Sequence, residues 1–106
     1  MANSKNNTID PLALRLSADT MRALANPLRL RIIAMLLEQP AICVQHIYSQ
    51  LGIEQSIASQ HLRILRQARL VHTTRKGKFV YYLLDEERLE KAGDIAGRLA
   101  ALIRKV

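Results

Sequence analysis

Hydrophobic residues recur with the period of an α-helix over most of this chain, beginning after two proline-containing caps. Asp10-Pro11 and Asn26-Pro27 each place an N-cap side chain before a proline, which is well accepted at the first position of a helix. Pro40 cannot continue a helix, so it marks the end of the second one. The pattern therefore predicts helices over residues 11–25 and 27–38.

Two more helices follow this pair. Apolar residues at helical spacing predict a short helix over 43–51, and Gly52 ends it because glycine readily adopts the left-handed conformation of a helix terminus. Over residues 55–68 the apolar side chains gather in one arc of roughly 160°. The opposite arc carries only amides, hydroxyls and guanidinium groups, on Gln55, Ser56, Ser59, Gln60, Arg63, Arg66 and Gln67.

The period changes from that of a helix to that of a strand after Leu70. Residues 70–75 and 79–84 are rich in Val, Thr and Tyr and flank Lys76-Gly77-Lys78, so we expect a hairpin with a cationic tip. Asp85 then caps a last helix. The apolar residues of this helix alternate steps of three and four, which is typical of a narrow helix-pairing seam.

The seam has two interpretations. It either packs against the protein's own first helix or pairs with a second copy of the chain, and the length of the last helix favours a dimer because the core of so small a domain is modest. A glycine within the helix would let a partner approach closely. We expect the dimer seam to consist of Leu89, Ala92, Gly93, Ala96, Leu99 and Ile103.

Length and composition narrow the class of protein. The 106 residues leave room for one domain, which we place at 10–106 after a mobile leader at 1–9. An aromatic content of 4%, with four glycines and three prolines, favours helices over a β-sandwich or barrel. No apolar run approaches the roughly 18 residues that span a bilayer, and the single cysteine cannot form an internal disulfide. We therefore expect a cytoplasmic protein without membrane contact.

The net charge of +7 is unevenly distributed. Between Gln55 and Leu84 there are six basic residues and no acidic one, which suits binding to a polyanion. The simpler alternative is that the polar arc of the 55–68 helix is only a solvated face. Solvated faces usually mix charges of both signs, however, and this one does not.

A short helix, a tight turn, a second helix and a basic hairpin follow one another in the order of a winged helix-turn-helix. We expect this fold, mainly α, with five helices and a two-stranded wing. The major groove of B-DNA is about 12 Å wide and admits one helix, whose outward side chains then meet base edges. We predict base contacts from Gln55, Ser56, Ser59 and Gln60, and phosphate contacts from Arg63, Arg66, Arg75, Lys76 and Lys78.

Four segments resemble motifs of the ArsR/SmtB family of transcriptional repressors. They are LANPLRLRII at 24–33, LGIEQSIASQHL at 51–62, LRQARLV at 65–71 and GKFVYYL at 77–83. The resemblance implies a homodimer whose first and last helices pair, which binds an inverted-repeat operator in double-stranded DNA and is released by an inducer. It implies DNA contacts from the same four glutamines and serines. Ile57 and Arg69 depart from the family pattern, which has Thr and Gly there.

Sensing residues of the family are mostly missing. Its arsenite sensors place three cysteines at the start of the helix-turn-helix, where this chain retains Cys43 and His46, and its zinc sensors use histidines that the last helix lacks. We predict no resident metal or other cofactor, and we expect Cys43 to be a small buried hydrophobe. An inducing metal or thiol-reactive compound acting through Cys43 and His46 is the alternative. We expect His61 in the interior and His72 on a sheet face.

Catalysis is disfavoured by geometry. Ser59 and His61 lie about 200° apart around a helix with 100° per residue, so they cannot form a nucleophile and base pair, and no phosphate-binding glycine loop is present. The chain is therefore not expected to be an enzyme. The second function class is a protein-interaction module, in which the seam and hairpin dock a protein partner without operator preference.

Overall fold

Five helices and three short strands make up residues 9–105, the part of the chain that the computed structural model describes, with side chains described for residues 9–101. This architecture confirms the predicted mainly α fold with a β-hairpin wing. The expected leader lies outside the described residues, except for Ile9. In chain order the elements are α2 (Pro11–Leu24), α3 (Pro27–Glu38), β1 (Ile42–Cys43), α4 (Val44–Leu51), α5 (Gln55–Gln67), β2 (Val71–Lys76), β3 (Phe79–Leu84) and α6 (Glu86–Lys105).

Both proline-containing caps form as predicted. The Asp10 carboxylate accepts a hydrogen bond from the backbone N–H of Leu12 at 3.4 Å. The Asn26 side-chain oxygen accepts from the N–H groups of Leu28 and Arg29 at 2.9 and 3.1 Å. Because these caps satisfy N–H groups that have no partner within the helix, they fix where α2 and α3 begin.

The sheet has the order β1-β3-β2, with both pairs antiparallel. In the wing, Val71 faces Leu84 and Lys76 faces Phe79 across the hairpin, and Gly77 turns the chain with a φ of 61°. The two-residue strand β1, which was not predicted, adds Ile42 opposite Tyr82. It attaches the start of α4 to the base of the wing.

The core lies where α3, α4 and α5 meet the sheet. Its fully buried side chains include Ile32, Ile47, Leu62, Leu65 and Val71. Helix α5 contributes through Ala58, Leu62 and Leu65, which follow one another at helical spacing. The predicted packed arc of α5 is too wide on one side, because Ile57 and Ile64, which lie together at one edge of it, are 38% and 39% exposed.

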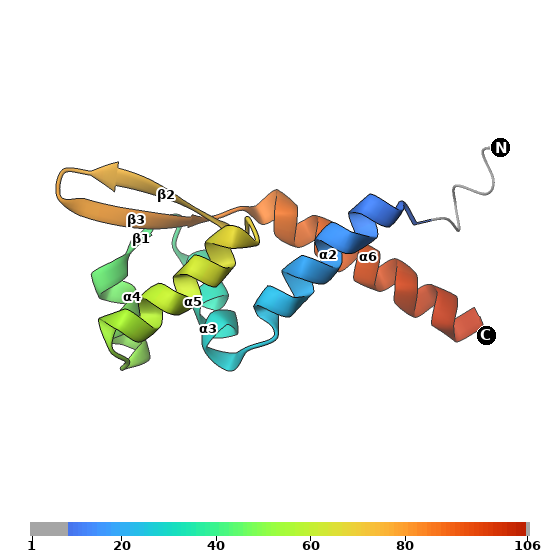
Figure 1. The fold of residues 1–106 in the computed structure, drawn as a ribbon, viewed down its shortest axis with the longest axis horizontal. Coiled ribbons are helices and arrows are strands. Elements are labelled where there is room, and N and C mark those ends of the chain that lie inside the picture. Colours follow the sequence, from blue (N-terminus) through green and yellow to red (C-terminus); the bar gives the residue numbers. More distant parts are fainter. Residues whose placement is uncertain (1–8, 106) are drawn as a thin grey trace.

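The molecule is elongated, with extents of 53 × 25 × 21 Å and a radius of gyration of 16.3 Å. A compact domain of about 100 residues has a radius of gyration of about 13 Å. Figure 1 shows the reason: the wing with α4 and α5 lies at one end, whereas α2 and α6 pack together at the other. The two ends therefore offer separate surfaces.

At Arg69 the chain has arginine where the family pattern has glycine. Its φ is 62°, in the left-handed region, in the turn between α5 and β2. Glycine is the usual residue at such positions because a side chain there is strained. The turn keeps the geometry that glycine favours, although arginine occupies it.

Candidate nucleic-acid interface

Helix α5 is held by its inner face and presents its outer face to solvent. Gly52, with a φ of 66°, ends α4, and the carbonyl of Glu54 accepts from the N–H of Ala58 at 3.1 Å to start α5. Packing of Ala58, Leu62 and Leu65 in the core then directs the polar arc outward. The predicted base-contacting residues, Gln55, Ser56, Ser59 and Gln60, are all exposed.

His61 joins this helix to α3 at the edge of the core. It is half-buried, and its Nδ1 atom lies 3.2 Å from Nη1 of Arg29. Burial, and to a lesser extent the positive charge of Arg29, lower the pKa of His61 below its ordinary value of 6.5. His61 is partnered as expected, but it lies at the edge of the core rather than in the interior.

The predicted phosphate-contacting side chains are likewise exposed on α5 and on the wing. None of them forms an ion pair with a carboxylate among the side chains that the structure describes. Lys78 lies at the wing tip, where its Nζ atom is 5.7 Å from the centroid of the Phe79 ring. These charges therefore stay free to meet a polyanion. They are Arg63, Arg66, Arg75, Lys76 and Lys78.

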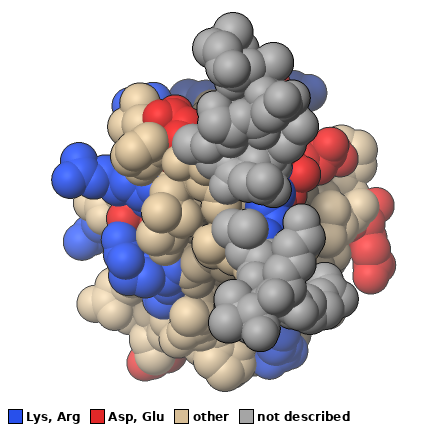
Figure 2. Space-filling model, turned by 90° about the vertical axis from the view of Figure 1, so that its right-hand side faces the viewer, with Lys and Arg blue, Asp and Glu red and all other residues tan. Residues whose placement is uncertain are grey.

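The opposite end of the molecule has a different charge pattern. Figure 2 shows that basic and acidic side chains are interspersed there around uncharged surface. Two i, i+4 pairs on α6 contribute, Lys91 with Glu87 at 3.8 Å and Arg98 with Asp94 at 3.6 Å. Such a mixed surface lacks the single sign of charge that favours DNA. The stretch without acidic residues, 55–84, comprises α5 and the wing.

Part of the expected dimer seam is already covered within the single chain. Helix α6 packs on α2 of the same chain, and this contact leaves Ala92 only 2% exposed. Leu89 also packs against the protein's own core. The face of α6 with Leu89 and Ala92 is therefore covered without a partner, which is the alternative that the sequence left open. Ala92 is already buried and adds little to a surface between subunits.

The remaining residues of the expected seam differ in burial. Gly93 and Leu99 are exposed, Ala96 is half-buried, and the side chain of Ile103 lies outside the described residues. A Cβ atom built at Gly93 or Gly97 would meet nothing within 4 Å. The glycines of α6 therefore face open space in the single chain, beside the face that packs on α2.

Cys43 and His46 lie at the junction of β1 and α4. Cys43 is half-buried and stands opposite Tyr81 in the sheet, whereas His46 is exposed on α4. Within the described part of the chain, no group of three or more His, Cys, Asp and Glu side chains is arranged to hold a metal ion.

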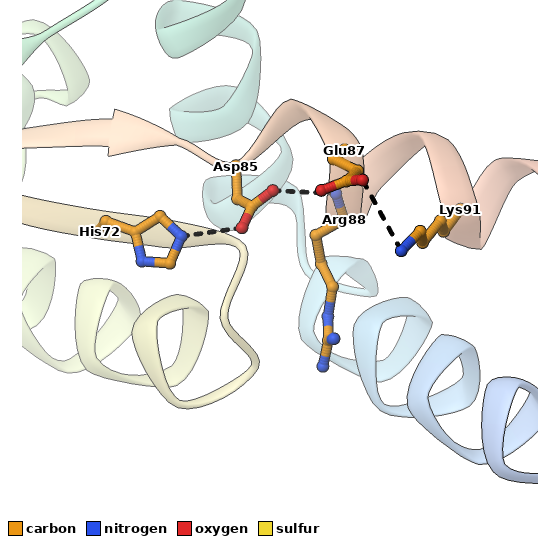
Figure 3. A network of polar contacts seen from close by, with 5 residues as sticks. All are labelled: His72, Asp85, Glu87, Arg88 and Lys91. Carbon is orange, nitrogen blue, oxygen red and sulfur yellow. Dashed lines mark hydrogen bonds and ion pairs between the residues drawn. The ribbon is translucent and has the colours of Figure 1, made fainter.

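Asp85 connects the wing to α6, as Figure 3 shows. Its Oδ1 atom accepts from the backbone N–H of Arg88 at 3.0 Å, and its Oδ2 atom lies 2.8 Å from Nε2 of His72 on β2. The hydrogen bond with His72, followed by the bond from the Arg88 backbone, lowers the pKa of Asp85 below its ordinary value. His72 is thus an exposed residue of the sheet that ties the hairpin to the helix cap.

Arg88 is a residue that the sequence interpretation missed. Its side chain is half-buried beside α2, although arginine in the first turn of a helix faces the positive end of the helix dipole. That unfavourable position was a signal in the sequence. Arg88 therefore does not stabilise α6 through the helix dipole, and its side chain lies instead between α6 and α2.

Together these features define a class of protein. An exposed helix with a polar outer face beside a cationic hairpin, in this element order, is typical of a winged helix-turn-helix DNA-binding transcriptional regulator. Residues 26–73 match the family described as "Bacterial regulatory protein, arsR family". The chain belongs to the ArsR family.

Relatives agree with this assignment. The HTH-type transcriptional regulator YbzH of Bacillus subtilis is 36% identical, over 72% of this chain and 90% of the relative. A homolog of the transcriptional repressor SmtB from Synechocystis is 39% identical, over 68% of this chain and 54% of its own length. The solved structure of HlyU from Vibrio cholerae, named a transcriptional activator, has a TM-score of 0.65 and 33% identity, covering 80% of this chain and 91% of HlyU.

These relatives are regulators of transcription, which confirms that the chain is not an enzyme. Among the described residues, no helix combines the length and the apolar character needed to cross a membrane.

Proposed function

We propose that the protein is a homodimeric repressor that binds an inverted-repeat operator, with one α5 helix in the major groove of each half-site. The observation that carries the proposal is the outer face of α5, where Gln55, Ser56, Ser59 and Gln60 lie exposed within a stretch that has no acidic residue. Glutamine and serine side chains suit hydrogen bonds to base edges. The cations of α5 and the wing then supply affinity for phosphate.

Pairing through α2 and α6 is supported by apolar surface that the single chain leaves uncovered. Leu12 of α2 is 60% exposed and Leu99 of α6 is 39% exposed, and these two helices pack together at the end of the molecule away from the wing. Leu16, one turn after Leu12 on the same side of α2, extends this apolar surface, which a second copy would cover. A two-fold dimer places two α5 helices on successive turns of DNA, as a palindromic operator requires.

The sign of regulation follows the family resemblance and the relative that is named a transcriptional repressor. The activator HlyU shows that a related fold also serves the opposite sign. A repressor occludes a promoter by binding alone, so the proposed function needs no resident metal or cofactor.

Titration of a duplex from the region upstream of the protein's own gene, at several salt concentrations, tests the proposal. Each neutralised phosphate contributes about −0.9 to the slope of log affinity against log salt, so the five candidate cations set a limit of about −4.5 per protomer. We expect a clearly negative slope and tighter binding than to random duplex. A protein-interaction module, the second candidate, would show no operator preference, and a flat salt response would exclude the proposed function.

A further inference from the structure

A cavity of about 380 Å³ lies between α2 and α6, apart from the proposed DNA-binding face. Its walls are mostly apolar, with Leu12 and Leu16 from one helix and Ile95 from the other. Arg88, Lys91 and Arg98 of α6 line it as well. Cavities of this size, mostly apolar with a few fixed polar groups, are typical of sites for small molecules.

Arg88 lines this cavity, and the hydrogen bonding of its side chain is incomplete. Its Nε–H is buried and has no hydrogen-bond acceptor among the side chains and backbone groups that the structure describes. A buried donor without an acceptor is unfavourable, because it has lost its water and gained nothing in return. In Figure 3 the Arg88 side chain points away from Asp85 and Glu87, toward α2.

Carboxylates of the chain itself are engaged elsewhere. Asp85 bonds His72 and the Arg88 backbone N–H, Glu87 pairs with Lys91, and Asp94 pairs with Arg98. Asp94 and Asp10 both line the cavity, and Asp10 caps α2. A guanidinium group presents its N–H donors in a planar fork that matches a carboxylate. None of these four carboxylates accepts a hydrogen bond from the Arg88 guanidinium.

We propose that this cavity binds a small organic carboxylate with an apolar body. The carboxylate accepts hydrogen bonds from the Arg88 guanidinium, and the apolar body packs against Leu12, Leu16 and Ile95. The charge recognises the anion, and the apolar wall selects against small inorganic anions, which have no hydrocarbon to bury.

Such a ligand would also act on pairing, a consequence that rests on the proposed function. Leu12 and Leu16 line the cavity and belong to the surface proposed to join the subunits. Occupancy therefore changes the shape of that surface and, through it, the spacing of the two α5 helices. In this way the carboxylate acts as an effector of operator binding.

Binding of octanoate to the purified full chain, measured by calorimetry and by NMR shifts of residues around the cavity, tests the proposal. 1-Octanol serves as the matched neutral probe. We expect octanoate to bind, with 1-octanol and the Arg88→Met variant each weakening binding by about tenfold or more, because a hydrogen bond to a charged group is lost. Ala13→Leu fills the cavity without changing charge and should also remove binding. Arg15→Gln loses the same charge from an exposed position outside the cavity and should bind octanoate like the unmodified chain.

Three outcomes would overturn the proposal. They are no octanoate binding by the unmodified chain, equal binding by the Arg88→Met or Ala13→Leu variants when circular dichroism shows them folded, and a dimer structure in which a carboxylate of the partner occupies the Arg88 site. Operator titrations run beside these measurements separate the two proposals. Octanoate binding without operator binding would contradict the proposed function alone, and the reverse would contradict this inference alone.

Discussion

The Nδ1 atom of His61 on α5 accepts a hydrogen bond from Nη1 of Arg29 on α3, with 3.2 Å between them. A guanidinium group only donates, so Nδ1 carries no proton and the ring is neutral with its hydrogen on Nε2. The Nε atom of Arg29 also donates to the carbonyl of Ala23 in α2. One arginine thereby connects α2, α3 and α5, and the proposed DNA-reading helix is held in place by a histidine that must stay uncharged.

This pair predicts a stability that depends on pH near neutrality. The pKa of His61 is lower in the folded protein than its ordinary value of 6.5, so the unfolded chain takes up a proton first as pH falls. The free energy of unfolding should be highest above that value and decrease as pH falls below it toward the folded pKa. Urea unfolding between about pH 7.5 and 5.5 measures it. His61→Leu should flatten the profile, whereas His46→Gln, at an exposed histidine, should leave it unchanged; a flat profile in the unmodified chain would contradict the assignment.

Base reading by α5 predicts a loss of discrimination on mutation. Ser59→Ala or Gln60→Ala should each reduce the preference for operator over random DNA by about 1–3 kcal/mol, because a hydrogen bond to a base edge is lost. Competition binding at one fixed salt concentration measures the preference. Gln39→Ala removes an exposed amide after α3 and is the matched control. Equal losses on both kinds of DNA would reassign these residues to phosphate.

The wing predicts the opposite pattern. Lys76→Ala should weaken binding to operator and random DNA alike and make the salt slope less negative by about 0.9 for each contact removed. Lys91→Ala, which removes an equal charge from α6, should leave both affinities and the slope unchanged. Selective weakening on the operator would instead place Lys76 at a base.

Pairing through α2 and α6 predicts a dimer of twice 12.0 kDa. Leu12→Glu and Leu99→Glu should each shift the protein toward the monomer, since a charge would have to be buried in an apolar interface. Sedimentation velocity at micromolar concentration reports the mass. Leu37→Glu is the control, because this leucine is 58% exposed on α3 and lies outside the proposed surface. A monomer before any substitution would remove the dimer from the proposal.

The left-handed turn at Arg69 predicts a stabilising substitution. A side chain in this conformation costs about 1–2 kcal/mol, and the greater freedom of glycine in the unfolded chain offsets about 0.4–1 kcal/mol of the gain. Arg69→Gly should therefore raise the free energy of unfolding by about 0.5–1 kcal/mol. Arg69→Ala separates this backbone effect from loss of charge, because it removes the guanidinium and keeps the strain. A glycine variant that is clearly less stable than the alanine variant would mean that the turn is not strained.

Local signals in the sequence predicted the elements well. Asp10 and Asn26 form the caps that their positions before proline predict, and the helices begin at the expected prolines. The polar face of α5 is exposed as predicted, because a regular period of apolar residues reports which side packs. Strand β1 was missed, since two residues have no period and Ile42 becomes a strand only through pairing with Tyr82.

The pattern of hydrophobic residues could not predict features that depend on packing between elements far apart in the chain. Ala92 fits a seam between subunits and a contact with α2 equally well, and only the folded chain shows that α2 covers it. The cavity at Arg88 arises where α2 meets α6, residues far apart in the chain. The position of Arg88 in the first turn of α6 was the one local feature of the sequence that pointed to this cavity.

The carboxylate of Asp85 connects the two ends of this elongated molecule. It holds the base of the hairpin through His72 and the first turn of the long C-terminal helix through the backbone of Arg88. If that helix rotates, we expect Asp85 to move with it and the tip of the wing to be displaced by an amount that grows with the length of the hairpin. In the proposed complex, small movements between the two copies would thus become large movements of the wing tip against the DNA backbone, without any rearrangement of the core.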